Sequence, residues 1–544
     1  MTSLASAPPA GVASRLASDR ALARATATIT AWNLVSRLTG FARVVATGAA
    51  LGATALGDTY QSANLVSNIL FELLAGGMLS SVLVPTFVGL IDRDRRADAA
   101  RLAGGLLGKT LAGLSLLVLA GMLASTWVMR LLTAGVDDGR VHDQQVRLGA
   151  FLLWFFLPQI LLYAAGAVAT ALLNADRRFT AAAIAPVFNN AVVITTMVAF
   201  RAMRHGSTGF DLAGSEKVVL ALGTSAGVLV MTVVPLLAVW RGGIALVPRW
   251  RTGAALRPLA RKGLWAAGHL GLNQLLVAVT IVLAARVHGG VIAYQIAFTF
   301  FLLPHAVLSN PIFTALYPRL AADAAAGRTD EFAADLATGL RYTAFLLLPA
   351  SALLAATARP VLDAVRLGAL DTAGAGLVAA VLAAYAIGLL GYSAFFLLTR
   401  AAYALDDVRG PTIVNLWATA AAVGAMVVAS SATDGRSKVV VLGLVHAGAV
   451  TVGSVALLAR VRGRLGRPIL IGRALSRDVV AAAIAGACGW AIVEAVASRE
   501  RGTALLAVAA AVAVGTVVYA IVQRMAGAPE LRSPLHAFAR EPTA

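Results

Sequence analysis

Long apolar stretches recur along the whole chain, separated by short polar segments. Fourteen of them reach about 20 residues or more, the length that an α-helix needs to cross the hydrocarbon core of a bilayer. Strands of a membrane barrel are much shorter, so we expect all of these spans to be helices. Their approximate bounds are residues 27–52, 59–91, 103–134, 147–174, 179–201, 216–240, 262–287, 291–318, 340–358, 372–399, 411–430, 438–459, 478–496 and 503–523.

The composition supports a membrane protein that crosses the bilayer many times. Of the 544 residues, 59% are hydrophobic and only 13% are charged, whereas a soluble protein of this size needs more charge to cover its surface. The single Cys488 lies in an apolar span, which excludes an internal disulfide or a cysteine metal cluster. We expect no metal or organic cofactor. The chain carries no nucleotide-binding loop, so direct use of ATP is not expected.

The net charge of +19 comes from arginines that gather in alternate short loops. These loops include residues 93–101, 177–178, 241–262 and 460–477. The positive-inside rule makes this set cytoplasmic and places both termini on the same side, and the arginines then face anionic lipid rather than nucleic acid. Residues 1–25 contain no apolar core, so we expect a cytoplasmic N-terminal segment without a cleaved signal peptide.

A repeat relates the two halves of the chain. The sequence "TYQSAN" at 59–64 returns as "AYQIAF" at 293–298, an offset of 234 residues, and Pro85 returns as Pro318 at an offset of 233. Six spans per half is an even number, so both halves enter the membrane in the same sense, as in transporters that rock two lobes around a central cavity. The predicted units are an N-lobe at 26–240, a basic linker at 241–261, a C-lobe at 262–459, two added spans within 460–524 and a cytoplasmic tail at 525–544.

Polar residues form a stripe on each of the first two predicted helices. At 100° per residue the first stripe occupies an arc of about 120° and the second an arc of about 80°. A charge at the bilayer centre costs at least about 2.5–3.5 kcal/mol, so these stripes must face a protein interior or a wet cavity. The first comprises Asn33, Ser36, Arg37, Gly40, Arg43 and Thr47, and the second Gln61, Asn64, Asn68 and Glu72.

The two arginines have different predicted surroundings. A hairpin turning near residue 54 puts Arg37 level with Glu72, so this pair could be a structural ion pair. Arg43 has no acidic residue at its own level, which favours an anionic ligand. The planar guanidinium suits phosphate because it donates two parallel hydrogen bonds. The repeat assigns Asn273 and Gln274 to the same cavity.

Three stretches carry a family resemblance: "NLVSRLTGFARVVATGAALG", "GDTYQSANLVSNILFELLAGGMLSSVLVPTF" and "ALLNADRRFTAAAIAPVFNNAVVI". They resemble the signature stretches of the MurJ/MviN-type lipid II flippases, which belong to a superfamily of multidrug and polysaccharide exporters. The resemblance is densest over residues 30–195 and fades after about 430. It implies an all-helical fold of about fourteen spans, with two pseudo-symmetric six-helix lobes around a central cavity and two C-terminal helices.

The resemblance also implies residue roles. It maps family arginines onto Arg37 and Arg43, the acidic residue that opens the second span onto Asp58, and an asparagine of that span onto Asn68. Independently of the resemblance, the polar stripes predict that Arg37, Arg43, Gln61, Asn64 and Asn68 bind substrate. Asp58, Glu72, Asn273 and Gln274 are the residues expected to support the site or gate it. Val44 stands where the family often carries an acidic residue. Phe71 and Thr299 stand where the family carries cavity arginines, so this cavity is less cationic than is usual in the family.

The implied function is transport of lipid II, a polyprenyl diphosphate-linked muropeptide, from the inner to the outer leaflet of a bacterial cytoplasmic membrane. Alternating access would use the membrane potential or a coupling ion, with cell-wall synthesis proteins as further partners. The outer loops are too short for an enzyme's catalytic domain. Three alternatives remain: a flippase for another lipid-linked oligosaccharide, an ion-coupled small-molecule exporter, and a transport-inactive scaffold of envelope synthesis.

Overall fold

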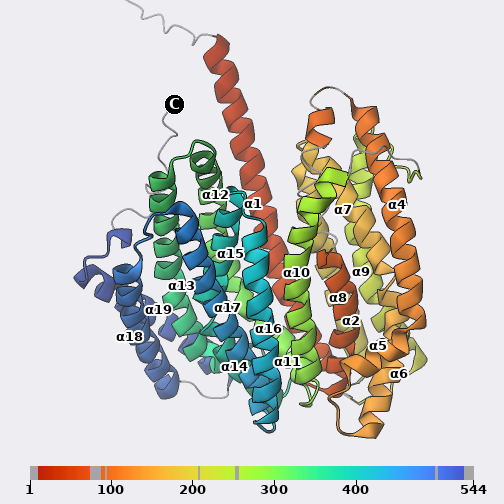
Figure 1. Cartoon of the computed structure of the whole chain (residues 1–544). Coiled ribbons are helices and arrows are strands. Elements are labelled where there is room, and N and C mark those ends of the chain that lie inside the picture. Colours follow the sequence, from red (N-terminus) through yellow and green to blue (C-terminus); the bar gives the residue numbers. More distant parts are fainter. Residues whose placement is uncertain are drawn as a thin grey trace, which may run out of the picture.

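A computed structural model describes residues 10–73, 87–91, 93, 95–205, 207, 209–250, 257–496 and 500–531. Every regular element in these ranges is a helix, and most of the helices run roughly parallel to one another in a bundle (Figure 1). Pro85 of the predicted repeat lies outside these ranges, as do residues 1–9 of the N-terminal segment, 251–256 of the linker and 532–544 of the tail. The side chain of Phe71 also lies outside the described part.

The N-lobe contains the helices that precede residue 242. Within it α1 packs against α8, α8 against α9, α9 against α7, and α2 against α6. These helices are α1 (Ala10–Leu51), α2 (Ala55–Leu73), α4 (Arg96–Leu123), α5 (Ser125–Leu132), α6 (Gly139–Phe156), α7 (Gln159–Ala175), α8 (Phe179–Met203) and α9 (Gly214–Arg241).

The C-lobe repeats this order of packing. Here α10 packs against α16, α16 against α17, α17 against α15, and α11 against α14. The same sequence of neighbours in both halves confirms the pseudo-symmetric arrangement expected from the repeat. The C-lobe helices are α10 (Arg257–Ala284), α11 (Gly290–Pro304), the π-helical turn η2 (His305–Ser309), α12 (Asn310–Ala325), α13 (Thr329–Val365), α14 (Thr372–Ala386), α15 (Leu389–Ala404), α16 (Arg409–Ser431) and α17 (Ser437–Leu465).

Two further helices, α18 (Gly472–Val496) and α19 (Arg501–Met525), pack on α13 at the outside of the C-lobe (Figure 1). The hydroxyl of Tyr519 on α19 donates a hydrogen bond of 2.8 Å to the backbone oxygen of Phe345 on α13. A short 3₁₀ turn, η3 (Pro529–Leu531), follows α19. The position of this pair agrees with two spans added after the second repeat.

The all-helical membrane fold predicted from the apolar stretches is confirmed. Eleven helical stretches within the described residues are long and apolar enough to cross a membrane, and a bent pair, α14 and α15, makes twelve. The predicted span at 262–287 corresponds to a shorter apolar stretch of α10, Gly268–Ala284. The predicted span at 59–91 begins with α2 and then passes through residues outside the described ranges.

Two departures from the predicted spans have a clear physical reason. Helix α1 already begins at Ala10, before the predicted start at 27, because the intervening residues are rich in alanine, leucine and arginine, which favour helix. The predicted span 372–399 bends by 50° between α14 and α15. At this bend Gly388 lies so close to Ala447 of α17 that an added Cβ would be 2.6 Å from its Cα.

The two lobes meet through the first helices of each half, α1 and α2 against α10 and α11. Phe41 on α1 packs edge-on against Phe300 on α11, with ring centroids 4.7 Å apart. One end of the molecule is closed where loop 52–54, loop 285–289 and loop 366–371 meet, and the backbone N–H of Ala369 donates to the oxygen of Ala49 at 2.7 Å. We call this the closed end, and the opposite end, which carries the arginine-rich loops, the basic end.

Candidate substrate-binding cavity

The polar stripes of α1 and α2 enclose a small cavity in the N-lobe, of about 60 Å³, which we call the N-lobe cavity. From the predicted set it contains Arg43, Gln61, Asn64 and Asn68. Helix α1 presents Arg43 and Thr47 to it, and one turn of α2 separates each of the polar residues that face them. The helical periodicity read from the sequence therefore brings these four substrate-binding candidates together.

Arg43 has no carboxylate partner in this cavity, because none of the described residues that line it is acidic. The other polar groups there are hydroxyls and amides, on Tyr60, Tyr163, Asn189 and Thr224 among others. Neutral groups can hydrogen-bond a guanidinium or its ligand but cannot neutralise it. The cavity therefore combines one half-buried positive charge with hydrogen-bonding groups, an arrangement suited to an anion.

Arg37 is placed differently from Arg43. It lies six residues earlier on α1, about 9 Å nearer the basic end at 1.5 Å per residue. Its side chain is exposed and lines neither of the two cavities described here. Both Arg37 and Glu72 belong to the described residues, and no ion pair joins them, so the structural pairing considered from the sequence is not formed.

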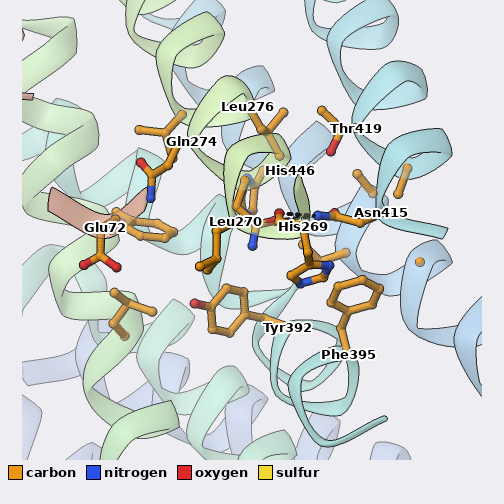
Figure 2. Close-up of a pocket in the computed structure, with 18 of the residues that line it drawn as sticks. Glu72, His269, Leu270, Gln274, Leu276, Tyr392, Phe395, Asn415, Thr419 and His446 are labelled. Carbon is orange, nitrogen blue, oxygen red and sulfur yellow. Dashed lines mark hydrogen bonds between the residues drawn. The ribbon is translucent and has the colours of Figure 1, made fainter. Parts of the chain in front are cut away.

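A larger cavity of about 460 Å³, the C-lobe cavity, lies between α2 and the helices of the C-lobe. Glu72 stands on one side of it and Asn415 and Thr419 on the other, with Tyr392 and Phe395 at one edge (Figure 2). Asn273 and Gln274 line this cavity, together with His269 and His446, and not the N-lobe cavity that contains Arg43. The only formally charged residue among its described lining, apart from the histidines, is Glu72.

The two cavities adjoin, because Gln61, Asn68 and Gln295 line both of them. Gln295 was absent from the sequence-based set, although the repeat contained the signal: it stands 234 residues after Gln61. Tyr60 and Tyr294 form a second related pair, and the Tyr60 hydroxyl lies 3.0 Å from the hydroxyl of Thr224. His446 was missed for a different reason, because a lone histidine in an apolar span forms no pattern.

Some polar residues near the cavities bond to neighbouring helices. Asn190 on α8 donates to the backbone oxygen of Ser36 at 3.2 Å and to the Thr39 hydroxyl at 3.0 Å, which ties α8 to α1. Asn415 on α16 donates to Asn273 Oδ1 and to the backbone oxygen of His269, both at 3.0 Å. These bonds fix the walls of the cavities. The structure gives Asn273 a structural partner as well as a place in the lining.

Asp58 lies in neither cavity but at the closed end, where it joins the two lobes. Its carboxylate accepts hydrogen bonds from the backbone N–H groups of Gly289, at 2.8 Å, and Ile292, at 2.9 Å. These N–H groups belong to the beginning of α11, where the helix dipole favours a negative charge. Asp58 is 3% exposed, so this bond between lobes is shielded from solvent.

The described residues offer no candidate metal site, since no three His, Cys, Asp or Glu side chains gather among them. The two cavities present one guanidinium, a carboxylate at the opposite side, and neutral polar and aromatic side chains between them.

A family model described as "Lipid II flippase MurJ" matches residues 47–518. This chain belongs to the MurJ family. The matched range contains both cavities except for the part of α1 before Thr47, and it includes α18. MurJ proteins are transporters rather than enzymes, and the family is one of multi-pass membrane proteins.

Individual MurJ relatives cover most of the chain. A probable lipid II flippase MurJ of Rhizobium meliloti (strain 1021) is 28% identical over 508 residues, which is 91% of each chain. The lipid II flippase MurJ of Burkholderia cenocepacia is 27% identical over 403 residues, covering 73% of this chain and 76% of the relative.

Solved structures show the same fold. A lipid II flippase MurJ in an inward closed conformation superposes with a TM-score of 0.74 at 17% identity, covering 91% of this chain and 98% of that one. An inward-facing multidrug resistance transporter of the MATE family, in the MOP superfamily, gives a TM-score of 0.64 at 14% identity over 79% and 94% of the two chains. At these identities the similarity concerns the fold alone.

Proposed function

We propose that this chain moves lipid II from the inner to the outer leaflet of the cytoplasmic membrane of a bacterium by alternating access. The observation that carries this proposal is Arg43, a positive charge held among neutral polar groups where the two lobes adjoin. A headgroup of sugars and diphosphate cannot cross hydrocarbon unaided, because each polar group buried without a partner costs several kcal/mol. Membership of the MurJ family supports lipid II as the substrate.

In this proposal the diphosphate binds to Arg43, whose two parallel N–H groups match phosphate oxygens. Gln61, Asn64 and Asn68, which line the same cavity, supply further hydrogen bonds. Arg37, exposed nearer the basic end, attracts the headgroup before it reaches Arg43. Glu72, Asn273 and Gln274 line the adjoining C-lobe cavity and support the rest of the headgroup.

Asp58 serves as the latch of the closed end. Its two hydrogen bonds to the beginning of α11 join the lobes, so they must break before that end can separate. Alternating access then consists of two states, one with this latch formed and the basic end accessible, and one with the latch broken. By the positive-inside rule the basic end and both termini face the cytoplasm.

The membrane potential favours this direction of transport. With the cytoplasm negative, moving two phosphate charges outward is favourable by up to about 4.6 kcal/mol at 100 mV, at about 2.3 kcal/mol per charge. Other charges on the headgroup change this sum.

A competing function, export of small cations, fits the cavities less well. Such an exporter needs carboxylates that are free to bind the cation, and Glu72 is the only acidic side chain among the described lining of both cavities.

Translocation by the purified full chain tests the proposal. The protein is reconstituted into liposomes that contain lipid II, and the fraction of headgroups accessible to an added soluble enzyme is followed with time. We expect faster appearance of accessible headgroups than in protein-free liposomes, and a further increase with a potential of the correct sign. Equal rates with and without protein would contradict transport and favour the scaffold function.

A further inference from the structure

The C-lobe helices that line the C-lobe cavity carry buried polar atoms that have no hydrogen-bond partner among the described residues. His446 on α17 is 5% exposed, and both of its ring nitrogens lack a hydrogen-bond partner among the described residues. His269 on α10 is 9% exposed, and its Nδ1 is unpartnered in the same sense. Both side chains line the C-lobe cavity. Buried polar groups are almost always satisfied, so two such histidines in the lining of one cavity point to a ligand.

Neighbouring rings hold these histidines in place. The His446 ring lies 5.2 Å from that of Tyr385 and 5.9 Å from that of Phe298, and His269 stacks on Phe395 at 5.9 Å. Because these rings pack around them, the imidazoles are held in the wall of the cavity. Tyr392 and Phe395 add flat faces to the same wall (Figure 2).

The chemistry of this wall identifies the class of ligand. A neutral imidazole presents one donor and one acceptor, which suits hydroxyl and acetamido groups because these also donate and accept. Aromatic faces contribute apolar contact to the C–H faces of a ring. The C-lobe helices contribute no lysine, arginine or carboxylate to the described lining, so this wall is poorly suited to a diphosphate or to the charged groups of a peptide.

We propose that the C-lobe cavity binds the sugars of the headgroup through His446 and His269, while Arg43 in the N-lobe binds the diphosphate. This assignment rests on the proposed function. The two subsites adjoin at Gln61, Asn68 and Gln295, so one headgroup reaches both lobes at once. The glycan therefore touches the lobe that moves relative to the lobe holding its phosphates, and separation of the lobes changes both sets of contacts together.

Two ligands separate the subsites: lipid II, and a polyprenyl diphosphate that has no glycan. Their dissociation constants are measured by native mass spectrometry on the full chain and its variants. His446→Phe keeps the ring but removes both nitrogens, and we expect it to weaken lipid II binding about three- to tenfold, the effect of one or two neutral hydrogen bonds, while polyprenyl diphosphate binds as before. His446→Gln restores a donor and an acceptor and should recover most of the affinity.

His305→Phe is the matched control, because His305 is also buried in the C-lobe but bonds to Ser393 at 2.8 Å and does not line the cavity. Its preference for lipid II should remain that of the wild type. If His446→Phe does not fold, His269→Phe tests the same wall. The assignment is wrong if the variants of both histidines leave lipid II binding unchanged or weaken both ligands equally. If the wild-type protein binds neither ligand, the proposed function itself fails.

Discussion

The two lobes repeat one arrangement of helices but line the interior with different side chains. At an offset of 234 residues, Gln61 of the N-lobe and Gln295 of the C-lobe stand at related positions, and both border the two cavities. At the same offset Arg43 corresponds to Val277, so the charge of one wall is replaced by an apolar group in the other. The two lobes thus share glutamines at the border between the cavities, Gln61 and Gln295, which we call the rim, and differ in the other residues that line each cavity. An elongated ligand with one charged and one neutral part fits such a pair of walls.

Moving the charge between the lobes should have the largest effect. Arg43→Gln removes charge-assisted hydrogen bonds of about 1.5–3 kcal/mol each, so we expect polyprenyl diphosphate to bind about 100-fold more weakly. Adding Val277→Arg to this variant should not restore the affinity, because the cation then lies on the wrong wall. Native mass spectrometry measures both, with Arg140→Gln as the control for an exposed arginine near the closed end. If Arg43→Gln binds polyprenyl diphosphate as tightly as the wild type, Arg43 does not bind the diphosphate and the charge difference between the lobes has no role in binding.

Gly57 lies at the contact between the two lobes, which we call the seam, and we expect this position to be too tightly packed for an added methyl group. A Cβ there would lie 2.5 Å from the oxygen of Gly52 and 2.8 Å from Cδ1 of Ile292 in the other lobe. We expect Gly57→Ala to lower the free energy of unfolding by about 2 kcal/mol, as overpacking does, and to lower the melting temperature in detergent. Gly424→Ala has open space around it and should leave the melting temperature unchanged or raise it. Equal behaviour of the two variants would mean that the seam is loosely packed.

The latch should have a smaller but more specific effect. Asp58→Asn removes the charge and one acceptor, so we expect the equilibrium to shift about tenfold toward separation of the closed end, or about 1.4 kcal/mol. Spin labels at the exposed positions Asp137 and Asp434, one on each lobe, report the distance. Asp407→Asn is the control, since Asp407 also accepts from the beginning of a helix, the Gly410 N–H at 2.8 Å, but within the C-lobe and away from the closed end. A distance distribution unchanged by Asp58→Asn would argue against a latch.

The rim residues should show the smallest effects. Gln61→Leu and Gln295→Leu each remove one neutral hydrogen-bonding group, so each should weaken lipid II binding about threefold. Similar losses would mean that both lobes contribute equally to the rim, whereas a loss confined to Gln61 would assign it to the N-lobe. Gln159→Leu serves as the control, because Gln159 is buried, bonds to Ser225 at 2.8 Å and lines neither cavity.

The sequence predicted the helical membrane fold, the repeat and the polar residues of α1, α2 and α10 that line the cavities, because all three depend on periodicity along single helices. The wheel placed Arg37 and Arg43 on one face, but it could not separate an exposed arginine from a cavity one. That difference depends on helices distant in the sequence, because residues of α2, α7, α8 and α9 surround Arg43. The bend at Gly388 depends in the same way on the approach of Ala447. The different surroundings of Arg37 and Arg43 and the bend at Gly388 could not be predicted from the sequence, because both depend on contacts between segments that are distant along the chain.

The hydrogen bonds of Asp58 make the contact between the two lobes asymmetric. Its carboxylate accepts a hydrogen bond from the N–H of Ile292, the residue that stands 234 positions after it. A chain of two identical halves would therefore form this bond twice, once in each direction across the pseudo-twofold axis. Ile292 has no side-chain oxygen that could accept a hydrogen bond from the N-lobe, so only one of these two symmetry-related bonds is present. A substitution at position 58 alone can therefore change the strength of the contact between the lobes, whereas in a chain of two identical halves both copies of the residue would have to change.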